Sequence, residues 1–547
     1  MNGTDAIARI LADEGVEWLA CYPNNPLIES AAKLGIRPIA FRHERGAIMA
    51  ADGYSRTSDR QRFGVAVVQS QAGAENALGG IAQAFADNVP ILVLPGGVNL
   101  DQLGVRPNFS AVRAYGSMLR HGETLYTPGQ IGHVMRRAFH ALRNGQGGPV
   151  LVELTGDVCA REVDFDALGY HSPRPAPQTA TPSAIEEAVD ALLAARKPLI
   201  WSGGGVLFAR ATAALRRLAE LTEIPVFCTM PGKSSFDETH PLSLGAGSGA
   251  TTLPAFRWIQ DCDVLLALGS SLTRSPYGQP IPAGKTIIHN TDNPSEINKD
   301  EPVSVALPGD ARLVIEALIE CIEDRLGPQG RKGKTDVAAE IAKLREAWLA
   351  EWQPLLDSDA TPLSTYRVIR DIDRTLDKAN SIVTHDAGAP RDSIVPFYTA
   401  TTPHGYVGWG KTTHLGFGIP LMIGAKMANP DKFCLNLMGD GAFGMSGLDL
   451  ETSARAGIPI TTVLLNNGGM ATYPGGFPTA REKFAFSSMQ GDYAGIARSM
   501  GAEGITVTRP GEMVPALESA QRLNADGKTV LIDVHSDMEG RRSRWDR

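Results

Sequence analysis

Two apolar stretches of this sequence each lead directly into small residues that present oxygen atoms. Residues 433–438 run into Gly439-Asp440-Gly441, and residues 460–465 run into Asn466-Asn467. Because ligands of open α/β sheets bind beyond the carboxyl ends of the strands, we expect the two turns to lie at one edge of a sheet. A carboxylate, an amide oxygen and glycine backbone suit a hard cation such as Mg²⁺ that is shared with phosphate oxygens.

The spacing of these turns carries more information than either turn alone. Asp-Gly is a common turn dipeptide, so an isolated Gly439-Asp440-Gly441 would more often be a plain strand-ending turn. Its separation from Asn466-Asn467 by the 24 residues 442–465 resembles the signature of thiamine-diphosphate-dependent enzymes. The resemblance implies that Asp440, Asn467 and the main-chain carbonyl of Gly469 are the Mg²⁺ ligands. It also implies cofactor contacts at Gly439, Gly441, Ala442, Asn467, Gly469 and Met470.

A glutamate near the start of the chain provides an independent check. Glu44 opens an alanine-rich helix pattern, and the ordinary explanation is a first-turn glutamate favoured by the helix dipole. The stretch 41–56, however, resembles the family's motif in which His-Glu opens a small-residue helix ending in Gly-Tyr-x-Arg. The resemblance implies that Glu44 hydrogen-bonds N1′ of the cofactor's aminopyrimidine, which promotes loss of the proton from thiazolium C2. In this family the two motifs meet across a subunit boundary, so it also implies a homodimer at least, and we expect a homotetramer.

Two further stretches agree with this resemblance. Residues 410–430 are similar to the segment that grips the pyrimidine, and Leu415 falls where a bulky apolar residue props the cofactor into its bent form. The carbonyl of Thr413 would accept a hydrogen bond from the 4′-amino group, although glycine is more usual at that position. Residues 384–393 are similar to the loop that adds diphosphate contacts, which assigns Gly388 and Ala389 to the cofactor. Plain Gly-rich turns are the alternative for both stretches.

Three residues are candidates for handling the substrate. By the resemblance, Asn25 sits near the reacting carbon, where decarboxylases place an aspartate or serine; an Asn-rich turn after a strand is the alternative. Gln71 lies in Ser70-Gln71-Ala72-Gly73, where the family usually has Ser-Gly-Pro-Gly, and either faces the cofactor or is a polar loop residue. Tyr473 is close to the position at which pyruvate decarboxylases carry a glutamate.

Histidines could also supply proton transfer. The adjacent histidines that pyruvate decarboxylases carry after the fourth strand have no counterpart in residues 96–112. His43, His121, His404 and His414 could reach the site, although an isolated histidine is more often structural. The chain thus lacks both the adjacent histidines and the glutamate that pyruvate decarboxylases use as acid–base groups. Their absence favours a carboligase over a simple decarboxylase.

The surrounding elements follow a regular alternation. Short β-rich runs alternate with helix patterns rich in alanine and leucine, which predicts α/β architecture with doubly wound parallel sheets. The proline-rich residues 170–183 and the polar residues 327–336 are predicted linkers. They divide the chain into an N-terminal pyrimidine-binding domain (1–170), a central domain (180–330) and a diphosphate- and Mg²⁺-binding domain (337–547).

The central part contains Gly203-Gly204-Gly205 after a predicted strand. This is weaker than a full G-x-G-x-x-G pattern. The order of parts resembles the central domain of family members that bind FAD, and equally that of members in which the domain is empty. Arg274 stands in a loop where flavin binders often have more basic or polar contacts, so FAD is possible but less expected than its absence.

Bulk properties exclude several classes of function. The 547 residues carry a net charge of −8, which argues against a nucleic-acid-binding protein. The six cysteines lack Cys-x-x-Cys spacing and indicate reduced thiols. No apolar run approaches the ~20 residues that span a bilayer, and residues 1–15 form an amphipathic pattern rather than a signal peptide. We therefore expect a cytoplasmic protein with no membrane partner.

The resemblance spans nearly the whole chain and is closest to acetolactate synthase-like members. It implies a lyase or transferase that decarboxylates a 2-keto acid such as pyruvate and transfers the fragment to a second carbonyl, an aldehyde or ketone. The alternative is a non-oxidative decarboxylase or C–C lyase of benzoylformate decarboxylase or benzaldehyde lyase type. A non-catalytic member of the family is a more remote possibility, against which Glu44, Asp440 and Asn467 argue.

Overall fold

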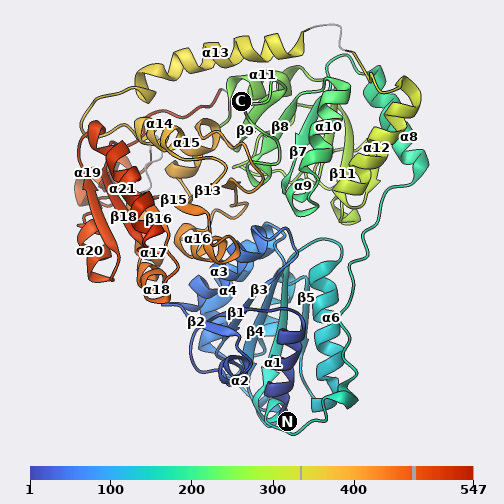
Figure 1. The fold of residues 1–547 in the computed structure, drawn as a ribbon, viewed down its shortest axis with the longest axis vertical. Coiled ribbons are helices and arrows are strands. Elements are labelled where there is room, and N and C mark those ends of the chain that lie inside the picture. Colours follow the sequence, from blue (N-terminus) through green and yellow to red (C-terminus); the bar gives the residue numbers. More distant parts are fainter. Residues whose placement is uncertain (333–335, 471–475, 546–547) are drawn as a thin grey trace.

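The computed structural model describes residues 1–332, 336–470 and 476–545. Its named strands form three six-stranded sheets in which all neighbouring strands are parallel (Figure 1). Strands such as β3 (Gly64–Val68) and β10 (Val264–Leu268) are buried along their whole length, as expected where helices cover both faces of a sheet. The predicted α/β architecture with three doubly wound parallel sheets is confirmed. The exact domain bounds 1–170, 180–330 and 337–547 stay a prediction.

The first and third sheets have the same connectivity. In chain order the strands of both sheets are arranged 2-1-3-4-6-5. The first sheet consists of β1 (Trp18–Cys21), β2 (Arg37–Ala40), β3, β4 (Ile91–Gly97), β5 (His121–Thr124) and β6 (Pro149–Thr155), with α1 (Gly3–Asp13), α2 (Leu27–Lys33), α3 (Glu44–Arg56), α4 (Ala72–Ala86) and α6 (Ile131–Arg143). The third consists of β13 (Ser381–His385), β14 (Tyr406–Val407), β15 (Phe433–Gly439), β16 (Thr461–Asn466), β17 (Glu503–Val507) and β18 (Val530–His535), with α14 (Thr365–Thr375), α15 (Ala389–Phe397), α16 (Gly418–Ala428), α17 (Asp440–Ser446), α18 (Asp449–Ala456), α19 (Pro478–Phe484), α20 (Tyr493–Ser499) and α21 (Met513–Ala525).

The middle sheet has a different strand order, 3-2-1-4-5-6 in chain order, which is the order found in dinucleotide-binding sheets. Its strands are β7 (Leu199–Ser202), β8 (Val226–Thr229), β9 (Ser243–Gly247), β10, β11 (Thr286–Thr291) and β12 (Val305–Pro308), and its helices are α8 (Pro182–Ala194), α9 (Gly204–Phe208), α10 (Thr212–Thr222), α11 (Leu253–Asp261) and α12 (Ala311–Leu326). The long α13 (Val337–Leu356) extends from this domain to the third (Figure 1).

Helices α3 and α16 join the first domain to the third through backbone contact. A Cβ added to Gly53 would lie 2.1 Å from the carbonyl oxygen of Leu421, and one added to Gly424 would lie 1.9 Å from that of Ala50. Both distances are far below any real van der Waals contact, so only glycine lets the two helices approach this closely. The two helices occupy equivalent positions, because each follows the second strand of its sheet and leads to the third.

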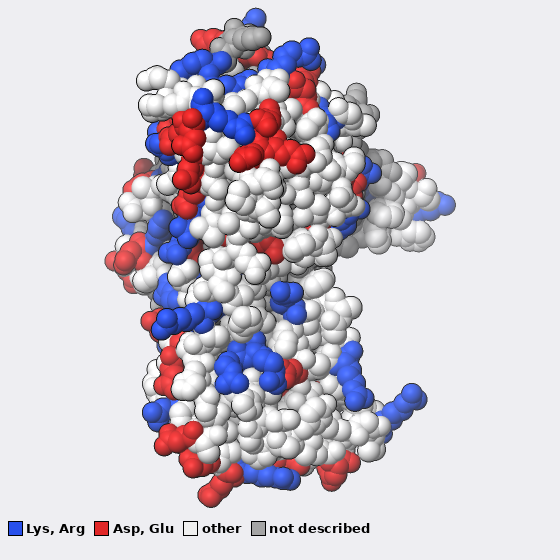
Figure 2. Space-filling view, turned by 90° about the vertical axis from the view of Figure 1, so that its right-hand side faces the viewer, with Lys and Arg blue, Asp and Glu red and all other residues white. Residues whose placement is uncertain are grey.

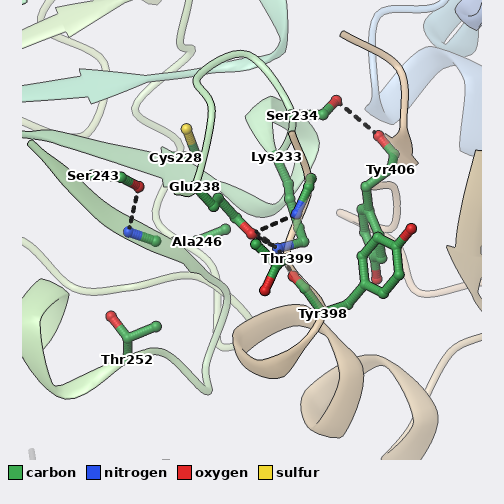
Figure 3. Close-up of polar contacts among 12 residues, drawn as sticks. Cys228, Lys233, Ser234, Glu238, Ser243, Ala246, Thr252, Tyr398, Thr399 and Tyr406 are labelled. Carbon is green, nitrogen blue, oxygen red and sulfur yellow. Dashed lines mark hydrogen bonds and ion pairs between the residues drawn. The ribbon is translucent and has the colours of Figure 1, made fainter. Parts of the chain in front are cut away.

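A buried ion pair joins the middle domain to the third (Figure 3). Lys233, which is 0% exposed, donates hydrogen bonds of 2.6 Å to both carboxylate oxygens of Glu238 and to the carbonyl oxygen of Tyr398. Glu238 Oε2 also accepts a hydrogen bond from the main-chain N–H of Ala400, at 2.9 Å. Because Lys233 hydrogen-bonds both Glu238 and Tyr398, and Glu238 also binds Ala400, the pair fixes the chain after β8 against the segment that leads into β14.

Removing one member of this pair is expected to destabilise the protein strongly. Lys233→Met leaves the carboxylate of Glu238 buried without a cation, and breaking such a pair typically costs about 3–5 kcal/mol of unfolding free energy. Urea denaturation followed by circular dichroism measures the loss. The double variant Lys233→Met/Glu238→Leu is the control, because an apolar pair of similar volume should recover most of the stability. A single variant as stable as the unaltered protein would contradict this account.

The surface is mixed in charge. On the face shown in Figure 2, acidic and basic side chains are interspersed and separated by a broad uncharged area. Five of the six cysteines are buried free thiols, and burial raises the pKa of Cys228 and Cys434 to about 12, so these thiols stay protonated and unreactive. In the described part of the chain, no helix is long and apolar enough to cross a membrane.

Candidate active site

The two oxygen-bearing turns lie side by side at the carboxyl edge of the third sheet. Strands β15 and β16 are hydrogen-bonded neighbours, with Gly439 paired to Leu465. Asp440 therefore follows one strand and Asn466-Asn467 follow its neighbour. The expectation that both turns lie at one edge is correct.

Asp440 connects the two turns through its carboxylate. The side chain is buried; Oδ1 accepts a hydrogen bond from the N–H of Gly441 (2.7 Å) and Oδ2 from the N–H of Gly468 (3.0 Å). Burial raises the pKa of Asp440 above its ordinary value, and these two backbone hydrogen bonds oppose the shift. A partly desolvated carboxylate gains most from a nearby cation.

The structure distinguishes the two asparagines. Asn466 donates a 3.0 Å hydrogen bond from Nδ2 to Asp533, so its side chain is directed into the domain. The side-chain oxygen of Asn467 accepts a hydrogen bond from the N–H of Gly469, at 3.1 Å. Asn467 is therefore the member of the pair that belongs to the turn beside Asp440.

The residues after Asn467 are held by a neighbouring segment. The N–H of Met470 donates to the carbonyl oxygen of Ser487 at 2.9 Å, and Gly469 forms an isolated bridge with Ser488. A Cβ on Gly441 would lie 3.2 Å from Cβ of Met470, so the start of α17 and the Asn467 turn touch. Ala442 is buried beneath them.

These donors fit a magnesium–diphosphate group. Asp440, Asn467 and the carbonyl of Gly469 offer oxygen ligands only, as a hard cation requires. Across residues 1–332, 336–470 and 476–545, no group of three or more His, Cys, Asp or Glu side chains could hold a metal by itself. A cation bound here would thus complete its coordination with oxygens supplied by a ligand, which is how Mg²⁺ commonly binds nucleotide and other phosphates.

The predicted diphosphate loop lies next to this site. Gly388 has φ +88° and immediately precedes α15, whose first residue is Ala389. A Cβ on Gly439 would lie 3.9 Å from Cγ of Pro390, so the β13 and β15 loops are adjacent. They flank the point where the strand order reverses, where ligands of such sheets bind. His385, at the end of β13, is fully buried and neutral, because burial lowers its pKa to about 3.

The segment predicted to grip the pyrimidine has an unusual backbone. Thr413 has φ +52°, a left-handed conformation that β-branched residues rarely adopt, and this explains why glycine is more usual at the position. Leu415 is 37% exposed, a high value for a leucine between two well-packed elements. Its side chain is available to contact a ligand.

Glu44 lies at the first turn of α3 and is only 4% exposed. Its Oε2 accepts a 3.1 Å hydrogen bond from Nδ2 of Asn76, and a Cβ on Gly73 would lie 3.5 Å from Oε1. The carboxylate is therefore fixed by α4, with one oxygen committed to Asn76. Asn76 was not among the predicted site residues. It lies three residues after Gly73 on α4, on the same face of the helix, and this spacing could have pointed to it.

Within one chain, the start of α3 lies beside the third domain. The guanidinium of Arg45 donates to the carbonyl oxygen of Met445, and the N–H of Arg42 donates to Asp449 at 2.9 Å. Met445 belongs to α17, the helix that begins with Asp440. The Glu44 motif and the Asp440 motif, almost 400 residues apart (440 − 44 = 396), therefore pack together within one chain, whereas the resemblance implied that they meet across a subunit boundary. An active site at a subunit interface stays a prediction.

Two of the substrate candidates are anchored to main chain. Asn25 donates to the carbonyl oxygens of Val68 (3.0 Å) and Leu94 (3.2 Å) and accepts from the N–H of Leu27 (3.1 Å). Gln71 has φ +55° and exchanges two hydrogen bonds with the main chain of Phe109. These contacts support a structural role for both side chains at the carboxyl edge of the first sheet, and their catalytic roles stay predictions.

Tyr473 lies outside the described residues. Among the histidines, His43 accepts a hydrogen bond from the N–H of Arg45 and caps α3. His121 pairs with Glu123, and His404 pairs with Asp59. His414 packs against Gly79, and burial lowers its pKa.

A cavity of about 610 Å³ opens at the carboxyl edge of the middle sheet, between the loops that follow β7 and β10. Gly203 and Gly205 line it, but a Cβ on either would come within 2.7 Å of the backbone of Gly269. Close packing of two loops is thus sufficient reason for these glycines. Arg274, which also lines the cavity, forms hydrogen bonds of 2.8 and 3.0 Å with Glu301.

Comparison with known proteins matches each part of this architecture. The sequence-family model "Thiamine pyrophosphate enzyme, N-terminal TPP binding domain" matches residues 1–120. The family models for the "central domain" and the "C-terminal TPP binding domain" of the same enzymes match residues 185–318 and 386–534. A probable acetolactate synthase large subunit from Methanocaldococcus jannaschii is 30% identical over 98% of this chain and 92% of its own length. The chain belongs to the thiamine-pyrophosphate enzyme family.

Other family members are similar along their whole length. The acetolactate synthase large subunit of Corynebacterium glutamicum is 30% identical over 97% of this chain and 86% of its own. Isozyme 3 from Escherichia coli is 27% identical over 98% of this chain and 95% of its own. The thiamine pyrophosphate (thiamine diphosphate) models place Glu44 in the N-terminal binding domain, and Asp440 and Asn467 in the C-terminal one. The predicted family is confirmed, and it is of the acetolactate synthase type.

Proposed function

We propose that this protein is a thiamine-diphosphate- and Mg²⁺-dependent carboligase. It would decarboxylate a 2-keto acid such as pyruvate and transfer the fragment to a second carbonyl compound. The observation that carries the proposal is the packing of the Glu44 helix against the domain that holds Asp440 and Asn467. Full-length similarity to proteins named acetolactate synthase supports the same reaction class.

The chain's own residues would divide the work as follows. Asp440, Asn467 and the carbonyl of Gly469 would hold Mg²⁺ and, through it, the diphosphate, assisted by the loops at Gly439 and Gly388. Thr413 would accept the 4′-amino hydrogen bond at its carbonyl oxygen, and Leu415 would enforce the bend. When bound, the cofactor supplies the carbanion that attacks a carbonyl carbon.

Glu44 would hold a proton at the aminopyrimidine. Because Oε2 already accepts from Asn76, Oε1 is the oxygen left to share a proton with N1′. Burial keeps water away from this hydrogen bond and makes it electrostatically stronger than it would be in solvent. Asn25, Gln71 and Tyr473 are the proposed residues nearest the substrate.

The products of one incubation test the proposal. Purified protein with thiamine diphosphate, Mg²⁺ and pyruvate should release CO₂ and form acetolactate or acetoin, identified by NMR. Acetaldehyde alone would favour the alternative, a non-oxidative decarboxylase. In a second incubation without pyruvate, cleavage of a benzoin-type substrate would favour a C–C lyase. No turnover of any 2-keto acid, together with no binding of thiamine diphosphate, would contradict both.

A second ligand is proposed for the middle domain. The cavity lies where the strand order of a dinucleotide-binding sheet reverses, and the carboxylates of Asp292 and Asp310 are part of its lining. The sequence made FAD less expected than its absence, but the cavity and the strand order favour a nucleotide-containing cofactor, with FAD as the first candidate. A visible absorption spectrum of the purified protein tests this, since a bound oxidised flavin is coloured, and a colourless protein that does not bind added FAD would exclude it.

We also propose that the protein forms at least a homodimer, with a homotetramer as the expected state. Several large apolar side chains of the third domain are exposed to solvent; they include Leu415, Met445, Leu448, Met470 and Phe484. A Cβ on Gly416, next to Leu415, would touch Met445, and one on Gly441 would touch Met470, so some of them lie beside the proposed site, where exposed apolar surface favours association. Light scattering coupled to size-exclusion chromatography would give the mass, and a monomer at all concentrations would refute the proposal.

A further inference from the structure

We propose that two buried carboxylates, Asp386 and Asp87, are positioning residues that hold both ends of the segment 410–418 in its cofactor-bending conformation. The proposal rests on the proposed function, because it concerns the aminopyrimidine end of thiamine diphosphate. Neither carboxylate belongs to the predicted cofactor contacts. One of them is contributed by the first domain.

Asp386 holds the carboxyl-terminal end of the segment. It is 0% exposed; its Oδ1 accepts from the N–H groups of Ala387 (2.8 Å) and Gly416 (2.9 Å), and its Oδ2 accepts from that of Gly418 (2.9 Å). Gly416 has φ +78° and directly follows Leu415. Both carboxylate oxygens are therefore used to fix the turn between Leu415 and the first residue of α16.

Asp87 holds the amino-terminal end. Its Oδ2 accepts from the N–H of Gly410 at 3.0 Å, and its Oδ1 accepts from that of Lys411 at 3.2 Å. Arg56 and Gln83 in turn donate to Asp87, at 3.2 and 2.8 Å. These three side chains come from α3 and the end of α4, so the first domain sets where the third-domain segment begins.

Gln83, on α4 one turn before Asp87, binds the middle of the same segment. Its Oε1 accepts from the hydroxyl of Thr412 (2.7 Å) and from the N–H of His414 (3.4 Å). Between these anchors lies Thr413, whose left-handed backbone conformation is costly for a β-branched residue and persists only where the surroundings impose it. The anchors on both sides supply that constraint.

The geometry predicts an effect on one end of the cofactor only. Thr413 and Leu415 would contact the aminopyrimidine, whereas the diphosphate would be held by the separate turns at Gly388 and Asp440. Loosening the segment should therefore weaken binding of thiamine diphosphate and leave binding of Mg²⁺ with pyrophosphate unchanged. A variant that merely destabilised the domain would weaken both.

The test is isothermal titration calorimetry of the full-length protein with Mg²⁺ plus thiamine diphosphate and, separately, with Mg²⁺ plus pyrophosphate. Asp386→Asn replaces an acceptor with a donor facing a backbone N–H. Gln83→Met removes the contacts to Thr412 and His414, and the hydrogen bond that supports Asp87, at similar side-chain volume. Each is expected to weaken thiamine diphosphate by about tenfold, the effect of one lost charged or buried hydrogen bond, with pyrophosphate affinity within a factor of about two.

Asp263→Asn is the matched control. Asp263 accepts two 2.8 Å backbone hydrogen bonds, from Arg196 and Lys197, but lies in the middle domain, and both affinities should stay unchanged. Unaltered thiamine diphosphate affinity in Asp386→Asn and Gln83→Met, or an equal loss for both ligands, would overturn the positioning role. Failure of the unaltered protein to bind thiamine diphosphate would instead overturn the proposed function, on which this role depends.

Discussion

Replacing Glu44 by glutamine is expected to lower turnover by about 10²–10⁴-fold, the usual contribution of a positioned acid–base group, while thiamine diphosphate still binds. The amide keeps the size and the buried position of the side chain, and it can still hydrogen-bond the cofactor. It cannot share a proton with N1′, so loss of the C2 proton becomes slow. Turnover with pyruvate and cofactor affinity by calorimetry measure the two quantities separately.

Glu29→Gln is the matched control for this variant. Glu29 is also a first-turn glutamate of a first-domain helix, but its side chain is exposed to solvent. Its replacement should leave turnover unchanged. Full activity of Glu44→Gln would refute the proton-sharing role, and loss of cofactor binding in that variant would show that Glu44 acts mainly in binding.

Replacing Asp440 by alanine is expected to abolish Mg²⁺-dependent binding of thiamine diphosphate. The variant removes the charged oxygen ligand and also the two hydrogen bonds that connect the Gly441 and Gly468 turns. The remaining donors, an amide oxygen and a carbonyl, carry no charge to offset that of the cation. We expect the affinity for thiamine diphosphate to fall by at least ~100-fold. Loss of a residue that only hydrogen-bonds a metal ligand already costs about 10–100-fold in metal affinity, and loss of a ligand itself should cost no less.

Two comparisons separate metal binding from folding. Asp440→Asn retains the shape of the side chain and should fold normally, yet it should still bind thiamine diphosphate poorly. Asp492→Ala removes an exposed helix-capping carboxylate in the same domain and should not alter the affinity. If calorimetry gave Asp440→Ala the affinity of the unaltered protein, the ligand assignment would be wrong.

The sequence was most informative where the chemistry is local. Asp440 and Asn467 directly follow strands, and Glu44 starts a helix, so the position of each follows from its own neighbours. The alternation of strand and helix patterns likewise predicted the three parallel sheets. In each case the type of element follows from neighbouring residues, although partners such as Gly468 for Asp440 and Asn76 for Glu44 lie 28 and 32 residues away.

Long-range partners could not be predicted in the same way. Asp386 bonds to Gly416 and Gly418, and Asp87 bonds to Gly410, yet nothing near either aspartate in the sequence specifies these partners. Asn25 was predicted to face the substrate, and only the fold reveals that its amide donates to the carbonyl oxygens of Val68, at the end of β3, and of Leu94, within β4. The left-handed conformation of Thr413 is equally invisible in the sequence, because threonine ordinarily avoids it.

The first and third domains share one strand order but carry different residues at equivalent positions. Two domains of the same strand order pack through the equivalent helices α3 and α16 inside one polypeptide. In a dimer of identical chains, any substitution appears on both sides of the axis. Here each half can change alone. One half carries a glutamate at the start of its helix, and the other carries Gly418 there and an aspartate after its third strand. Covalent linkage thus permits one architecture to specialise separately for the proton sharing proposed for Glu44 and for the metal binding proposed for Asp440.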